Sequence, residues 1–329
     1  MSKPAFDRVG FEILWQHANP LVDIVFVHGL MGDRRETWAK GTTLWPESLL
    51  PAKVPQSRIL TFGYDADIYH FWSPASDNTI KNHADSLIAG LVAFRYDKKE
   101  TVERPIIFVA HSLGGLALSM AEDSLQSDNN RISDCTRRIA FLGTPHQGSD
   151  KAQWVELGKN FLSILSNKTT GGILKELEQG SVTLGNLAAE FPKWLSHRKE
   201  KIKVVCFFEE LSTNISGKSI GKIVTETAAK LPEYETLSIH ANHCDMCKFS
   251  DPKDGNYLKV ANILEKWATE LKDEVKEDEA KKEDPQTFGN ITANNKFGKH
   301  NQGTQAGFVH SEGPTNFGSG FTGSMNSPK

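Results

Sequence analysis

The sequence predicts an α/β protein built on a mostly parallel, doubly wound sheet. Short apolar runs of strand length alternate with longer segments of helical period, which is the order expected when helices join parallel strands. The runs are nearly continuous in Ile, Val and Phe, as in strands that are covered on both faces. They occupy residues 21–29, 57–64, 105–111, 137–145, 202–208 and 236–241.

The bulk composition fits one large domain of this class with additional material. The chain has 329 residues, of which 38% are hydrophobic and 24% are charged. This length is enough for one α/β domain with a sizeable core. The formal net charge of -3 gives no reason to expect a nucleic-acid partner. One helical face is predicted from Ala84, Leu87, Ile88, Leu91, Val92 and Phe94.

Several expectations concern location and cofactors. The N-terminal segment lacks the basic, apolar and small-residue regions of a secretory signal, and no apolar run reaches about 18 residues. We therefore expect a cytoplasmic protein without a transmembrane helix. Four cysteines in a chain of this length do not make a disulfide framework. The single CxxC pair, Cys244 and Cys247, is weak evidence for zinc or redox chemistry, so no metal and no organic cofactor are expected.

Changes in composition divide the chain. The strand–helix alternation occupies residues 1–272, and the amphipathic patterns of 151–200 indicate a cap-like helical insertion between two strands. Ordinary packing helices are favoured there over a substrate lid. Residues 273–284 hold seven acids and three bases, which indicates a charged linker or a frayed helix end. Residues 285–329 are rich in Gly and Asn and are expected to form a disordered tail.

A serine lies where a strand run meets a helical run. The segment AHSLG places Ser112 two residues after Ala110 and two before Gly114, as in the G-x-S-x-G nucleophile elbow with Ala for the first Gly. The turn is sharp, so it needs small residues at both positions, and the following helix directs its N-terminus at the site. This context favours Ser112 as a nucleophile over a structural serine, and it indicates an α/β-hydrolase fold.

A nucleophile of this kind needs an oxyanion hole. One donor is expected to be the backbone N–H of Leu113, the residue after the serine. The other is expected at the end of the strand run 21–29, where His28 and Gly29 form a supporting turn and the N–H of Leu30 is the predicted donor. The alternative for this loop is a tight turn that requires Gly for its backbone alone.

The general base is expected late in the chain, because this fold orders its residues as Ser, acid, His. His240 and His243 are the candidates. His240 falls inside the strand pattern, where burial is expected, whereas His243 lies in the loop beyond it and is preferred. His111 is expected to point away from the site and to be structural, and His146 comes too early in chain order.

The acid is expected at the end of the preceding strand, where Glu209 and Glu210 are adjacent. A buried carboxylate that accepts a hydrogen bond from the histidine fixes its tautomer and stabilises the imidazolium. Glu209 is favoured because it ends the apolar run, and Glu210 is the reserve. Solvation at the surface is the alternative for either glutamate.

A set of segments resembles a known family. HGLMGDRRETW, LWPESLLP, AHSLGG, FLGTPHQGSD, FFEEL and NHCDMCKF together resemble the fungal SesB-like α/β hydrolases. This lipase/esterase family is related to the serine-active-site-containing and the GPI-inositol-deacylase-like hydrolases. The resemblance covers roughly residues 8–270 and implies Ser112 as nucleophile and His243 as base. It implies the acid less firmly, because two glutamates are adjacent.

The tail carries a second resemblance. NQGTQAGF is similar to the amyloid motifs, related to those of animal necroptosis, that fungi append to cell-death effectors. Asn and Gln side chains can ladder in register while Gly allows close sheet packing. The resemblance implies self-assembly and an NLR-type receptor with a matching motif. The motif is expected within about 290–320, around Asn301, Gly303, Gln305 and Gly307.

Together these features predict a serine hydrolase for carboxylic esters, with lipid esters favoured. The tail is expected to recruit it in fungal non-self recognition or regulated cell death, and peripheral membrane contact on activation stays open. Two alternatives remain. One is a housekeeping intracellular lipid deacylase with an inert tail, and the other is a catalytically silent signalling adaptor.

Overall fold

The computed structural model of the chain describes most of the predicted sheet and its helices. The described residues up to Lys281 belong to one compact unit. The tail predicted at 285–329, including Asn301, Gly303, Gln305 and Gly307, lies outside the described residues. The described part is residues 8–283 except 30–31, 65–75, 97–102, 125–129, 148–153, 161–184, 187, 197, 199–200 and 216.

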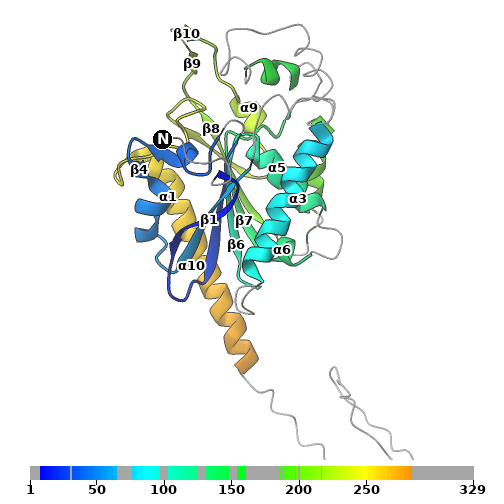
Figure 1. The fold of residues 1–329 in the computed structure, drawn as a ribbon, viewed down its shortest axis with the longest axis vertical. Coiled ribbons are helices and arrows are strands. Elements are labelled where there is room, and N and C mark those ends of the chain that lie inside the picture. Colours follow the sequence, from blue (N-terminus) through cyan, green and yellow to red (C-terminus); the bar gives the residue numbers. More distant parts are fainter. Residues whose placement is uncertain are drawn as a thin grey trace, which may run out of the picture. The chain divides into compact units, whose positions relative to one another are not determined.

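Seven strands form the central sheet, in the order β1-β5-β2-β6-β7-β8-β11 (Figure 1). Only β1 runs antiparallel to its neighbour in this sheet, so the predicted fold class is confirmed. All six predicted apolar runs form strands in it. The strands are β1 Gly10–Gln16, β2 Val22–Val27, β5 Ser57–Gly63, β6 Ile106–His111, β7 Thr136–Leu142, β8 Lys203–Glu209 and β11 Glu235–Ile239.

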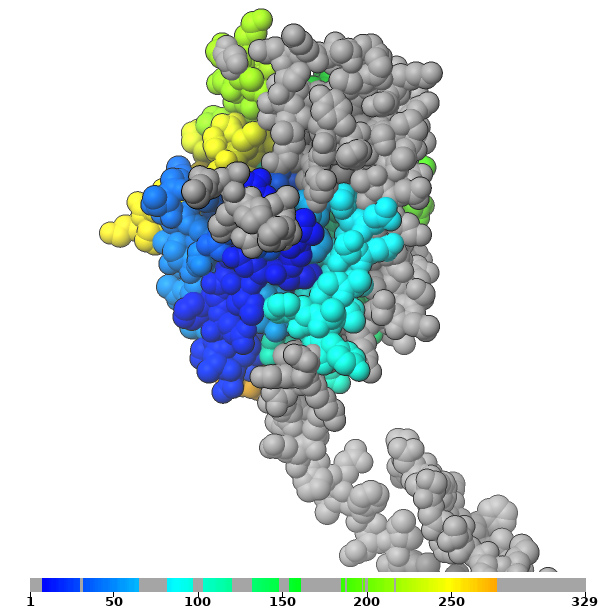
Figure 2. Space-filling model, in the orientation of Figure 1, coloured from blue at the N-terminus to red at the C-terminus, as the bar shows by residue number. Residues whose placement is uncertain are grey.

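Strand β1 is not among the predicted strands. Only Leu14 of its seven residues is buried, and Glu12 and Gln16 leave an apolar run of just three residues, shorter than those of the inner strands. Its pairing with β5 and the contacts of Phe11 with Phe62 and Phe94 hold it at the edge of the sheet. Figure 2 shows β1 in dark blue beside α3 (Ser76–Arg95) in cyan on one face of the molecule.

Helices cover the sheet on both faces, as Figure 1 shows. In β2, Ile24 and Phe26 join the core on the side of α10 (Gly255–Glu283), and Val25 and Val27 join the core on the side of α3. This alternation is the period-2 geometry of a strand that is buried twice. The remaining short elements are η2 Glu36–Trp38, β3 Ala39–Lys40, β4 Thr43–Leu44, α1 Trp45–Ser48, η3 Leu50–Ala52, α5 Gly114–Ser124, α6 Asn130–Cys135, β9 Asn214–Ile215, β10 Lys218–Ser219 and α9 Glu226–Ala229.

Two segments predicted from the sequence, 151–200 and 273–284, include residues that the structure does not describe, so only their described parts can be compared. Within the predicted cap-like insertion, residues 154–160 and 188–196 are helical. Phe191 and Leu195 lie in the core on the α3 side of the sheet, so this part acts as packing helix. The predicted charged linker 273–284 continues α10 as far as Glu283. Arg138 of β7 contacts Glu274 at 2.8 Å, which supports the helix at that point.

Asp23 at the start of β2 is fully buried and binds three arginines. Arg58 donates to both of its carboxylate oxygens, at 2.9 and 2.6 Å. Arg104 donates to Oδ1 at 3.0 Å, and the guanidinium of Arg95 lies 3.7 Å from Oδ2. All three arginines are at least nine-tenths buried. A buried carboxylate among buried cations is costly to remove, because its partners lose their compensating charge.

Replacing Asp23 by asparagine is therefore expected to lower the free energy of unfolding by about 3–5 kcal/mol. Urea unfolding followed by circular dichroism measures the change. The matched control is Glu265→Gln, which removes the partly exposed pair with Lys53 and is expected to cost less than about 1 kcal/mol. Equal effects of the two substitutions would show that the buried cluster does not stabilise the sheet.

Candidate active site

The serine elbow lies between β6 and α5. Ser112 follows the last residue of β6 and has a φ of 56°, a left-handed conformation that is uncommon for a non-glycine residue. Its backbone N–H donates to the carbonyl of Leu142 in β7 at 2.8 Å, and the residue is 2% exposed. A Cβ at Gly114 would lie 2.1 Å from the carbonyl oxygen of His28, so this position needs glycine.

His243 is brought against this serine from 131 residues away along the chain. It is buried in a turn that follows β11, and its Nε2 lies 3.0 Å from Oγ of Ser112. The serine hydroxyl can donate to Nε2 in this geometry, which is the relation of a nucleophile to its general base. Gly143, with a φ of 61°, lies beneath the imidazole, where an added Cβ would be 2.9 Å from Cε1.

Glu209 completes the arrangement from the end of β8. Nδ1 of His243 donates to its Oε2 at 2.8 Å. Its other oxygen, Oε1, accepts the backbone N–H groups of Ile223 and of Val224, the latter at 3.1 Å. Both oxygens of this fully buried carboxylate therefore accept hydrogen bonds, one from the imidazole and two from the backbone.

The structure separates the two adjacent glutamates. Glu210, the reserve candidate, lies at the surface, and Nδ1 of His240 lies 2.7 Å from its Oε2. Hydrogen bonds from Ser238 and His240 lower the pKa of the Glu210 carboxyl. The expectation that His240 is buried within a strand is wrong, because β11 ends one residue earlier, at Ile239.

The loop after β2 lies directly against Ser112. A Cβ at Gly29 would lie 2.5 Å from Cβ of Ser112, so only glycine allows this approach. His28 braces the same turn: its Nδ1 donates to the Gly29 carbonyl at 2.8 Å, and its Nε2 accepts the N–H of Tyr64 at 3.3 Å. Leu30, the predicted second oxyanion donor, lies outside the described residues, whereas Leu113 is buried directly after the serine.

His146 and the cysteine pair are not part of the hydrogen-bonded arrangement of Ser112, His243 and Glu209. His146 is buried and packs its ring edge-on to Phe141 at 4.4 Å. Cys247 donates its thiol to the carbonyl of Thr37 at 3.2 Å. Among the described residues there is no group of three or more His, Cys, Asp or Glu side chains that could hold a metal ion.

Three buried histidines make stability depend on pH. Burial lowers the pKa of His28 to about 4 and those of His111 and His146 to about 3. In the unfolded chain each of these histidines has a pKa near 6.5. Between pH 6.5 and about 4 the unfolded state therefore binds more protons than the folded state, so lowering the pH favours unfolding.

We expect unfolding free energy to fall by up to about 1.4 kcal/mol per histidine per pH unit across this window, and to be independent of these groups above it. Urea unfolding at pH 7.5 and 5.5 measures the loss. His146→Leu should reduce the pH dependence, whereas His240→Asn, at an exposed position, should not. An unchanged dependence in His146→Leu would contradict the buried, neutral state of that ring.

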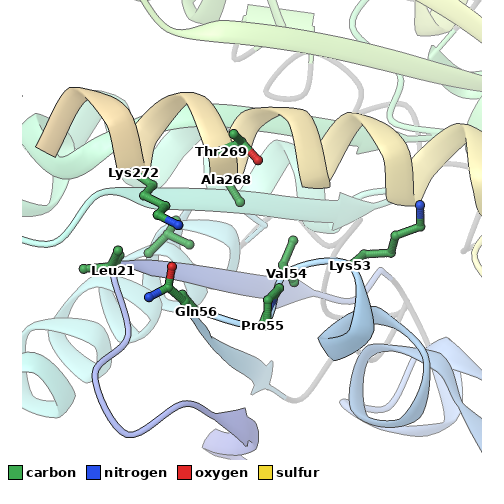
Figure 3. Close-up of a pocket in the computed structure, with 9 residues that line it drawn as sticks. Leu21, Lys53, Val54, Pro55, Gln56, Ala268, Thr269 and Lys272 are labelled. Carbon is green, nitrogen blue, oxygen red and sulfur yellow. The ribbon is translucent and has the colours of Figure 1, made fainter. Parts of the chain in front are cut away.

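A cavity lies at the end of the sheet where the parallel strands begin. It has a volume of about 150 Å³ and forms between α10 and the segments that lead into β2 and β5 (Figure 3). Lys53, Gln56 and Lys272 are among its lining residues. Ser112, Glu209 and His243 lie at or just beyond the carboxyl ends of their parallel strands, whereas this cavity lies at the amino ends of β2 and β5.

A mostly parallel sheet with a serine on a left-handed turn between a strand and a helix defines the class of the α/β hydrolases. Residues 19–206 match the family described as "Putative serine esterase (DUF676)", and the chain belongs to this family. The described residues include no helix that is both long and apolar enough to cross a bilayer.

Among curated proteins, the chain is similar to "Protein SERAC1" of Bos taurus, with 29% identity over 248 residues. The protein of the same name from Homo sapiens is 27% identical over 248 residues. Each alignment takes in 69% of this chain but only 36% of the relative, so the chain spans about a third of the length of these relatives.

Solved structures to which the chain is similar include the Bacillus licheniformis lipase BlEst2. It is 17% identical, with a TM-score of 0.48, over 78% of this chain and 97% of that one. A Paleococcus ferrophilus monoacylglycerol lipase is 12% identical, with a TM-score of 0.43, over 79% and 98% of the two chains.

Proposed function

We propose that the protein hydrolyses carboxylic esters by nucleophilic catalysis, with Ser112 as nucleophile, His243 as general base and Glu209 as the acid that orients it. The observation that supports this most directly is one continuous chain of hydrogen bonds. It runs from Oγ of Ser112 to Nε2 of His243 at 3.0 Å, and from Nδ1 to Oε2 of Glu209 at 2.8 Å. The backbone N–H groups of Ile223 and Val224 donate to the other carboxylate oxygen, so the position of Glu209 is fixed by the backbone.

Each residue then has a defined task. Oγ of Ser112 attacks the ester carbonyl while Nε2 of His243 takes the hydroxyl proton. The Glu209 carboxylate stabilises the imidazolium, and the N–H groups of Leu113 and Leu30 are the proposed donors to the oxyanion. The imidazolium gives its proton to the departing alkoxide. Water, deprotonated by the same imidazole, then cleaves the acyl-enzyme and restores the serine.

The substrate and cellular role are proposed from the resemblance to SesB-like lipases and esterases. It favours an acyl ester of a lipid, and it makes the protein an effector in fungal non-self recognition or regulated cell death. The tail around Gly303, Gln305 and Gly307 is proposed to assemble in register and to be templated by an NLR-type receptor with a matching motif. This part of the proposal is supported by the sequence of the tail alone.

Labelling with a fluorophosphonate tests the catalytic part. The reagent phosphonylates activated serines, and peptide mass spectrometry identifies the modified residue. We expect modification at Ser112 together with turnover in a series of p-nitrophenyl esters of increasing acyl length. Ser119, whose hydroxyl donates to the Gly115 carbonyl in α5, is the internal control and should stay unmodified. Absence of both labelling and turnover would favour the silent adaptor instead.

A further inference from the structure

We propose that His111 is a positioning residue that ties the nucleophile elbow to the turn that carries the base. This inference rests on the proposed roles of Ser112 and His243. Nε2 of His111 lies 3.0 Å from the backbone carbonyl oxygen of His243. A carbonyl only accepts, so Nε2 carries the proton and donates it. The sequence predicts that this ring points away from the site. In the structure, the ring contacts His243 directly.

The position of His111 makes this hydrogen bond a strut. His111 is the last residue of β6, pairs with Leu142 of β7 and directly precedes Ser112. Ser112 itself is anchored to Leu142 through its N–H. The elbow is thus fixed to the sheet, and the side chain of His111 reaches from it to the main chain of the base. The hydrogen bond from His111 to the His243 carbonyl therefore helps to set the distance between Oγ of Ser112 and Nε2 of His243.

The ring of His111 is enclosed on two sides. The imidazole of His243 lies on one side, with 5.1 Å between the ring centroids. The indole of Trp38, itself fully buried, meets the ring edge-on at 6.4 Å between centroids. A donor held this way has little freedom to swing, so it constrains the carbonyl that it binds.

The charge of His111 suits this role. Burial, together with the charges of His243, Lys248 and His28, lowers its pKa to about 3, although the hydrogen bond with the His243 backbone acts in the opposite direction. The ring is therefore a neutral donor throughout the neutral range. This neutrality matters because a cation so close to His243 would oppose formation of the imidazolium during proton transfer.

Loss of the strut is expected to act on turnover more than on binding. A displacement of about 1 Å between nucleophile and base can cost about 10²-fold in rate, because the transition state requires their alignment. Ground-state binding of the ester does not require it. We therefore expect a lower kcat with KM nearly unchanged.

The test compares three substitutions in the full-length chain. Glutamine can place an N–H near the Nε2 position, asparagine has the same amide but is too short, and leucine has no donor. We expect His111→Leu and His111→Asn to lose roughly 10- to 100-fold in kcat, with KM within about threefold. His111→Gln should recover most of kcat. If His111→Leu does not fold, the contrast between glutamine and asparagine still decides the result.

His146→Leu is the matched control for loss of a buried, neutral imidazole. It is expected to retain kcat, because His146 makes no hydrogen bond to the turn of His243 among the described residues. An equal fall of kcat in His146→Leu and in all His111 variants would overturn the proposal in favour of a general packing effect. Full kcat in His111→Asn and His111→Leu would also overturn it.

A spectroscopic readout separates this inference from the proposed function. The proton between Nδ1 of His243 and Glu209 should give a downfield proton resonance in the unmodified protein and in His111→Gln. In His111→Asn and His111→Leu it should broaden or disappear. This pattern without any ester turnover would support the strut and refute the proposed reaction. Turnover with an unaffected resonance in all variants would refute the strut and leave the reaction intact.

Discussion

Replacing Ser112 by alanine is expected to reduce kcat/KM for any ester that the protein hydrolyses by about 10⁴- to 10⁶-fold. Alanine keeps the Cβ that packs against Gly29 and removes only the attacking oxygen. The residual rate would come from substrate binding and the oxyanion donors. The measurement is initial rates on p-nitrophenyl esters, with circular dichroism to show that the fold is retained.

The control for this substitution is Ser119→Ala in α5, which removes a buried hydroxyl bonded to the Gly115 carbonyl. We expect its effect on kcat/KM to be within a few fold, because it lies outside the hydrogen-bond chain. Equal rates for Ser112→Ala and the unmodified protein would exclude Ser112 as the nucleophile. They would leave the measured hydrolysis to another group or to a contaminant.

The second large effect is expected at Glu209. Glutamine has nearly the same shape, but its amide group must face either Nδ1–H of His243 or the N–H groups of Ile223 and Val224. In both orientations a donor meets a donor, so the imidazole loses its preferred tautomer or the side chain leaves its place. We expect kcat to fall by about 10³- to 10⁴-fold, as for loss of the carboxylate in other triads.

Glu210 gives an adjacent control for this measurement. Glu210→Gln changes the same residue type one position along the chain but affects only surface contacts, those with Ser238 and His240. We expect kcat to change less than about twofold. A larger loss in Glu210→Gln than in Glu209→Gln would assign the role of the acid to the surface glutamate and contradict the observed arrangement.

These two glutamates show what the sequence could and could not determine. The elbow is a local feature, because strand, small residues and helix follow one another within a few positions, and so Ser112 could be found directly. The choice between Glu209 and Glu210 depends on where β8 ends and which way each side chain turns. That depends on the pairing of Glu209 with Ile239 in β11, which apolar periodicity does not specify.

The same limit explains the error at His240 and the absence of β1 from the prediction. The apolar pattern of 236–241 suggested that His240 lies in the strand, but pairing ends at Ile239. Strand β1 contains Glu12 and Gln16 and, as an edge strand, leaves Ile13 and Trp15 exposed, so its pairing with β5 is what identifies it. The role of Gly143 beneath His243 is a close contact between distant segments, so its sequence neighbours gave no signal.

The sheet order has a consequence for how the proposed catalytic arrangement comes apart on denaturation. His243, the proposed base, follows β11, which among the described residues is the last strand of the sheet and is bonded only to β8. Terminal strands detach at a lower free energy than inner ones, in sub-global openings of the native state. Mild denaturant should therefore release His243 while β2, β5 and β6 stay protected from hydrogen exchange. Inactivation would then report the detachment of one strand rather than the collapse of the molecule.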